Sequence, residues 1–189
     1  VAVSPGERPK PSAALVLLAQ SEHGYENLMK LNSCLYLEKD GQLPQVSLED
    51  LELHSQDLIC LSGGAYGPVG QLLQTGQRPA AEQLVKRLAE AFENRIYIEL
   101  QRHPGENGLP EAERLTEKAF LEIAYEMALP LVATNDVFFP KSDMYEAHDA
   151  LLCVAEGRYV SEVDRPRVNP QHYLKTPQEM QALFSDIPE

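Results

Sequence analysis

The sequence predicts an α/β protein in which strands and helices alternate along the chain. Short apolar runs typical of buried strands occur at 13–19, 58–61, 95–100 and 131–133. Between them lie longer segments whose apolar residues recur at helical spacing, and long successions of hairpin-connected strands are missing. Such alternation is typical of parallel β/α units with helices covering the sheet. About four units are present, whereas a closed barrel of the common kind needs about eight.

Length and charge narrow the class further. The 189 residues, 43% of them hydrophobic, suffice for one domain with a sizeable core. No apolar run approaches the ~20 residues of a membrane span. The net charge is −13, and the basic residues are scattered apart from Arg165 and Arg167. Direct DNA binding by this segment is therefore not expected, and the acidity favours solubility or a basic protein partner.

Cysteine usage and the first residues suggest a compartment and an origin. Three cysteines lie far apart without a CxxC pair, as expected for buried thiols in a reduced, cytoplasmic protein. The chain opens on Val1-Ala2-Val3, without an initiator Met or a leader, as though a strand were already under way. We therefore expect a fragment of a longer protein.

Helix boundaries are marked by capping residues. Ser47 with Asp50, and Thr176-Pro177-Gln178-Glu179, are signatures of helix starts. Ser142 is expected to cap a helix that reaches about residue 155, and Pro110 to begin a long one. Further helices are predicted at 22–37, 67–73 and 79–92. The buried faces of the helix at 22–37 and of the one from Pro110 are predicted to hold Tyr25, Leu28, Met29, Leu31 and Leu35, and Leu115, Ala119, Phe120, Ile123, Ala124 and Met127.

Two residues follow predicted strands at the edge where α/β proteins usually place their chemistry. Asp136 comes just after the strand at 131–133, and is either a metal ligand or acid–base group or simply a turn former. His103 follows the strand at 95–100 and is either a ligand on the same rim or a solvated loop histidine. Phe138 occupies the position where a metal-binding strand end would gain from a histidine.

Other polar groups have simpler interpretations. Glu99 alternates with apolar neighbours and points either into a barrel or, as we favour, onto an exposed strand face. His148 is expected to be half-buried and hydrogen-bonded within a helix. The glycine-rich turn at 62–67 lacks the lysine of a phosphate loop, so a tight strand-to-helix turn explains it. His23, His54 and His172 show no spacing to another ligand.

Six motifs in order closely resemble the PHP (polymerase and histidinol phosphatase) domain of bacterial DNA polymerase III alpha subunits. The resemblance covers essentially the whole chain, although the family's opening His-x-His strand is not in it. The motifs are GYENLMKLNS (24–33), LICLSGG (58–64), RIYIELQRH (95–103), LPLVATNDVFF (129–139), EAHDALLCV (146–154) and YLKTPQEMQALFSDIPE (173–189).

The resemblance implies a fold and a lost site. The fold would be a distorted (β/α)₇ barrel, of which this chain is the incomplete C-terminal part. Active members bind a metal cluster and hydrolyse phosphoesters, but their ligands are replaced here at Ala14, Gly64 and Phe138. Asp136 survives, and His103 matches a histidine of some relatives, so both are vestigial metal-ligand candidates. Because divalent ions need several donors, we expect no catalytic residues and no cofactor bound by this fragment.

The resemblance also implies a parent protein and partners. The parent would bind DNA and extend it from deoxynucleoside triphosphates, using Mg²⁺ on a palm domain beyond Glu189. Residues 1–157 would be the PHP domain without its first strands, and residues 158–189 its segment leading toward the palm. Relatives with a degenerate site dock the epsilon proofreading exonuclease among other replicase subunits.

Two alternatives to a docking role are kept. One is a metal-dependent 3′–5′ exonuclease that still works through His103, Asp136 and ligands in the missing segment. The other, weaker one is an unrelated small-molecule β/α enzyme. Because an open barrel exposes strand edges, self-association of the isolated fragment is also expected.

Overall fold

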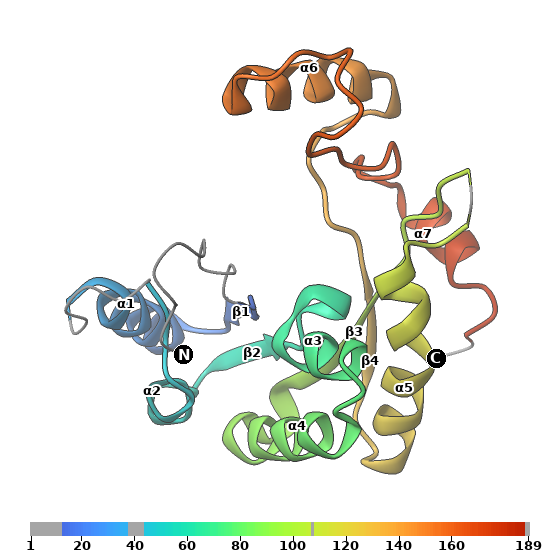
Figure 1. Ribbon diagram of the computed structural model, residues 1–189. Coiled ribbons are helices and arrows are strands. Elements are labelled where there is room, and N and C mark those ends of the chain that lie inside the picture. Colours follow the sequence, from blue (N-terminus) through green and yellow to red (C-terminus); the bar gives the residue numbers. More distant parts are fainter. Residues whose placement is uncertain (1–12, 38–43, 107, 188–189) are drawn as a thin grey trace.

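A four-stranded mixed sheet organises the protein (Figure 1). The computed structural model describes residues 13–37, 44–106 and 108–187. The strands lie in chain order in the sheet and are β1 (Val16–Ala19), β2 (Leu58–Leu61), β3 (Ile96–Gln101) and β4 (Leu131–Thr134). The last three are parallel, as the alternating pattern predicts. The expected strand at Val1–Val3 lies outside the described residues.

The first strand departs from the predicted parallel arrangement, because β1 pairs antiparallel with β2. Two helices, α1 (Glu22–Leu37) and α2 (Leu48–Leu53), separate these strands in place of one crossover helix. They run out and back, so the chain returns to the sheet edge it left. The backbone N–H of Gln20, just after β1, accordingly donates to the Asp57 carbonyl, just before β2, at 2.9 Å.

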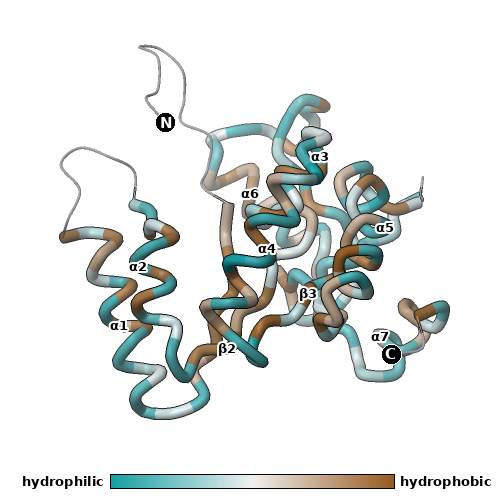
Figure 2. The backbone as a smooth tube through the Cα atoms, turned by 90° about the horizontal axis from the view of Figure 1, so that it is seen from below, coloured by the Kyte–Doolittle hydropathy of each residue, from teal (hydrophilic) through white to brown (hydrophobic). Residues whose placement is uncertain are grey.

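Three helices enclose the core on the parallel strands. They are α3 (Pro68–Gln74), α4 (Arg78–Phe92) and α5 (Glu111–Glu126). Figure 2 shows apolar backbone at β2 and β3 in the middle of the molecule. Each fully buried Leu, Ile or Phe there contributes about 1.5–3 kcal/mol. The fully buried apolar side chains of this core include Leu58, Val69, Val85, Leu88, Phe92, Ile96, Ile98, Phe120 and Ile123.

Two predicted helix faces are wrong in part. Tyr25 and Met29 of α1 are exposed, because the helix turns Gly24 against the Asp57 carbonyl. A Cβ on Gly24 would lie 2.2 Å from that oxygen, so only glycine allows this approach. On α5, Leu115 is exposed while Glu113 is buried. Contacts with other segments thus decide which side of each helix faces inward.

The capping predictions fare better. Ser47 accepts the Asp50 N–H at 3.1 Å, and Thr176 forms a complete capping box at the start of α7 (Pro177–Leu183). Ser142 is the exception, because its side chain caps nothing. It instead begins a 3₁₀ turn, η3 (Ser142–Met144), and α6 (Tyr145–Glu156) follows.

The C-terminal third extends away from the sheet. Helix α6 stands apart at the top of Figure 1, reached from β4 and left by a segment that returns to α7. Arg102 holds α7, where this segment ends, since its guanidinium binds Asp186 at 2.6 Å and the Leu183 carbonyl at 2.8 Å. Across the described ranges, every helix is too short or too polar to cross a membrane.

Candidate functional site

The carboxyl ends of the parallel strands and the start of β1 meet at one edge, called the rim below. A Cβ on Gly63 would lie 2.3 Å from the Ala14 carbonyl, and one on Gly64 would lie 2.8 Å from the Gln101 amide. Gln101 in turn donates to Thr134 at the end of β4, at 3.2 Å. Positions 14 and 64, where the resemblance implies lost ligands, therefore face the same rim.

The two predicted rim residues are brought together. The backbone N–H of Asp136 lies 3.3 Å from Nε2 of His103. His103 is 1% exposed, so the solvated-loop interpretation of this histidine is wrong. Asp136 itself is exposed, and its main chain, not its carboxylate, makes this contact.

Glu113 explains why His103 is buried. The Glu113 carboxylate, 3% exposed, lies 2.6 Å from Nδ1 of His103 and accepts the His103 backbone N–H at 2.9 Å. A buried carboxylate is stable when it is hydrogen-bonded in this way. By its position in the chain, Glu113 is only an acidic residue in the first turn of α5. Its role as the partner of His103 depends on how α5 crosses the end of β3.

These contacts define the tautomer of His103. Because Nε2 accepts a backbone N–H, the ring proton sits on Nδ1 and is donated to Glu113. Both ring nitrogens are therefore engaged. Through these two hydrogen bonds the imidazole links α5 to the segment after β4, and it has no lone pair left for a metal ion.

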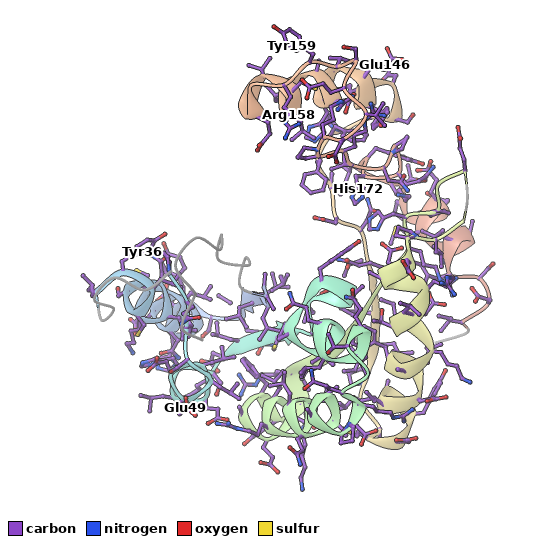
Figure 3. All side chains as sticks on the ribbon, viewed as in Figure 1. Tyr36, Glu49, Glu146, Arg158, Tyr159 and His172 are labelled. Carbon is purple, nitrogen blue, oxygen red and sulfur yellow. The ribbon has the colours of Figure 1, made fainter. Side chains whose placement is uncertain are left out.

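His172 adds a second imidazole to this link, although no spacing in the sequence relates it to the rim residues. Its Nδ1 lies 2.7 Å from the Asp136 carbonyl, and its ring stacks on His103 with 4.0 Å between centroids. The two stacked imidazoles thus bind the Asp136 backbone, His103 at its N–H and His172 at its carbonyl. Figure 3 shows His172 in the returning segment below α6.

Burial determines the charge of His172. Desolvation lowers its pKa below the ordinary value. The hydrogen bond to the Asp136 carbonyl opposes this shift without cancelling it. The neutral ring with its proton on Nδ1 is therefore favoured, which suits a donor to a carbonyl.

Phe138 occupies the outer side of the stacked histidines. Its ring centroid lies 5.2 Å from that of His172 and 5.7 Å from that of His148. His148 is half-buried as predicted, but its Nε2 has no hydrogen-bond partner within the described ranges, so the expected hydrogen bonding fails at that atom. The predicted ligand position is thus an aromatic contact.

Glu99 corrects a further expectation. It is 3% exposed and does not lie on an exposed strand face. Its carboxylate accepts the Gly63 N–H at 2.9 Å and hydrogen bonds from Gln101 and Thr134. The glycine turn is therefore structural, with φ of 84° at Gly63 and an N–H already used.

Cys60 has no reactive role here. It lies fully buried on β2, and burial raises the pKa of its thiol to about 12, with the charge of Glu99 adding to the effect. A thiol in this environment stays protonated and is a poor nucleophile or ligand.

The donor set at the rim does not fit a metal cluster. In the described part of the chain, no three His, Cys, Asp or Glu side chains are arranged to hold a metal ion. His103 is saturated, Cys60 is buried, and positions 14, 64 and 138 carry no donor. The cavity beneath the rim, between Glu99 and Glu113, has a volume of about 10 Å³ and could hold at most one water.

Comparison with known proteins agrees with this architecture. The PHP domain family model matches residues 2–103, more than half of the sequence, and the chain belongs to the PHP domain family. It is 43% identical over 187 residues to the DNA polymerase III subunit alpha of Caulobacter vibrioides, covering 98% of this chain and 16% of that protein.

Further relatives carry the same name. The DNA polymerase III subunit alpha of Rickettsia bellii is 38% identical over 93% of this chain and 15% of its own length. That of Pseudomonas aeruginosa is 38% identical over 97% of this chain and 15% of its own length. The resemblance drawn from the six motifs is confirmed. The chain spans about one-sixth of the length of these relatives.

Proposed function

We propose that this chain is the PHP module of a bacterial replicative polymerase alpha subunit and serves assembly, not catalysis. Its partner in this role is the epsilon proofreading exonuclease. DNA and nucleotide binding, and the Mg²⁺ ions of polymerisation, belong to the palm of the longer cytoplasmic polypeptide. The relatives of the same name and their sixfold greater length support this proposal.

One observation carries the proposal: the rim histidine is used as structure. His103 spends both ring nitrogens on Glu113 and on the Asp136 backbone, and Phe138 packs where the family resemblance implies a ligand. A phosphoesterase needs open coordination positions, and a single exposed carboxylate does not gather a metal cluster. The acidic surface suits a protein partner better than a DNA channel.

The proposal extends to the fold. The four-stranded sheet would be part of a distorted (β/α)₇ barrel whose other strands lie in polypeptide outside these residues. Residues 158–189 would lead from the PHP domain toward the palm. A crystal structure of the longer polypeptide with β1 left as an edge strand would contradict this part.

Metal content and nuclease activity test the loss of catalysis. Inductively coupled plasma analysis of the purified full-length polypeptide should find fewer than two tightly bound metals per chain attributable to the PHP domain. Exonuclease assays with added manganese or zinc should show no activity that Asp136→Asn removes. Two or more tightly bound metals, with nuclease activity lost in Asp136→Asn, would establish the exonuclease alternative.

Docking is tested separately. Epsilon should be retained by full-length alpha in a pull-down and lost when the PHP domain is deleted. Primer extension by the deleted protein checks that its polymerase part still folds. Undiminished epsilon binding to an active PHP-deleted polypeptide would refute the assembly role.

A further inference from the structure

Helix α6 is apolar on both of its sides. Its inner face carries Tyr145, His148 and Cys153, which turn toward Phe139 and the returning segment. Its outer face is also mostly apolar, with an acidic residue near each end of the helix. The exposed residues of the helix are Glu146, Ala147, Ala150, Leu151, Val154, Ala155 and Glu156. A helix with apolar residues on opposite sides normally lies buried in a larger body.

Helix α4 provides the contrast within the same molecule. It buries Val85, Leu88 and Phe92 and turns Lys86 and Glu90 to solvent. That is the ordinary pattern of a surface helix. Helix α6, by contrast, exposes Leu151 and Val154 to solvent.

The segment after α6 extends this apolar surface. Tyr159, Val160 and Val163 are 77%, 56% and 91% exposed. Figure 3 shows Tyr159 on the outer side of α6, away from the sheet. An exposed apolar surface of this extent is uncommon on a monomer and indicates an interface.

A buried ion pair holds the surface in place. The Arg165 guanidinium binds both oxygens of Asp149 on α6 at 2.5 Å, and its side chain is 2% exposed. This fork joins the segment to the helix through two parallel hydrogen bonds. The surface is therefore pre-organised for a partner.

We propose that α6 and residues 158–164, together called the α6 face, are covered by another part of the same longer polypeptide. Transient interfaces are about as polar as ordinary protein surface, whereas permanent ones resemble a domain core cut in half. Leu151, Val154 and Val163, 64%, 79% and 91% exposed, fit the second kind. The charged residues Glu146 and Arg158 lie beside them, as on the polar rim of an interface. The occupant is a mainly apolar surface, and the relatives, about six times longer than this chain, have the polypeptide to supply it. The inference rests on the proposed function.

Cysteine labelling in the full-length polypeptide tests the proposal. Leu151→Cys and Val163→Cys report on the α6 face, and Leu53→Cys on α2, 75% exposed, is the matched control. Native Cys60, fully buried, is the protected reference. Maleimide labelling of each position is measured by mass spectrometry and normalised to its rate in concentrated urea. Positions 151 and 163 should label about tenfold or more slowly than position 53.

Each other outcome overturns the proposal in a distinct way. Equal labelling at the three positions would mean that the α6 face is open to solvent. Protection that disappears on dilution would assign it to a second copy of the protein. Protection that appears only after epsilon is added would assign it to a separate subunit.

A second set of variants guards against loss of docking by the cysteine itself. Leu151→Ser with Val154→Ser should lower the Tm of the full-length polypeptide, because a covered apolar contact is lost. Tyr25→Ser with Met29→Ser, two residues that are also exposed on α1, should leave the Tm unchanged. Equal Tm values for both pairs would contradict the proposal. The epsilon pull-down is independent, so an open α6 face with normal epsilon docking leaves the proposed function intact.

Discussion

Replacing Glu113 with alanine probes the structural use of the rim most directly. The substitution removes the acceptor for two buried donors, the His103 ring N–H and its backbone N–H. Hydrogen bonds to a charged group contribute about 1.5–3 kcal/mol each, and an unpaired buried donor costs about 1–3 kcal/mol. Because the His103 ring is neutral, the loss comes from these two hydrogen bonds to the carboxylate, and together they give an expected cost of about 3–5 kcal/mol for Glu113→Ala.

Two further variants grade the effect. Glu113→Gln keeps the shape and one acceptor but turns an amide N–H₂ toward the second donor, so about 2 kcal/mol should be lost. Glu111→Ala is the matched control, because that carboxylate is 80% exposed and makes a surface ion pair, with 4.0 Å between it and the Arg114 guanidinium. Its loss of a helix-terminus charge and a surface ion pair should cost no more than about 1 kcal/mol.

Urea denaturation followed by circular dichroism measures these losses as changes in the free energy of unfolding. The expected order is Glu113→Ala, then Glu113→Gln, then Glu111→Ala. If Glu113→Ala and Glu111→Ala agreed within about 0.5 kcal/mol, the buried His103–Glu113 pair would not be structural. His103 would then count again as a possible metal ligand.

Three more predictions follow from single contacts. The pKa of His172 is lowered in the folded protein, so the unfolded chain binds a proton at this residue more readily as the pH falls below about 6.5. The free energy of unfolding should therefore decrease as the pH falls. In His172→Phe, the urea midpoint should decrease less between about pH 7.5 and 5.5. Gly63 has φ of 84° and lies against the Ala14 carbonyl, so Gly63→Ala should lower the free energy of unfolding by at least about 2 kcal/mol in the urea assay. Gly76 has φ of 72° but no atom within 4 Å of an added Cβ, so Gly76→Ala should lower it by about 1 kcal/mol. Arg102→Lys loses the fork to its two carboxylates, and hydrogen exchange in α7 should become about tenfold faster; an unchanged rate would show that this fork does not hold the segment.

Local patterns in the sequence were sufficient for most of the elements. The capping box at Thr176 and the cap at Ser47 involve contacts three residues apart, which can be read directly from the chain. The strands that end near His103 and Asp136 were predicted from apolar runs followed by turn residues. Their shared rim followed from parallel pairing alone, because parallel strands end at one edge.

Contacts between distant segments decided what those residues do. Nothing near His103 in the sequence indicates that Glu113 and Asp136 will take both of its ring nitrogens, or that His172 will stack on it. The direction of β1 likewise depends on two helices running out and back.

Sequence by itself therefore determined which segments form strands and helices, and which positions reach the rim. Tertiary structure alone decided that His103, a candidate ligand, is buried with both ring nitrogens hydrogen-bonded, because packing brings together partners that lie far apart in the chain. It also left Leu151 and Val154 of α6 exposed, where a local pattern would suggest an ordinary buried helix. Burial is a property of the assembled molecule, so a face that is exposed on this chain can be covered in a longer polypeptide.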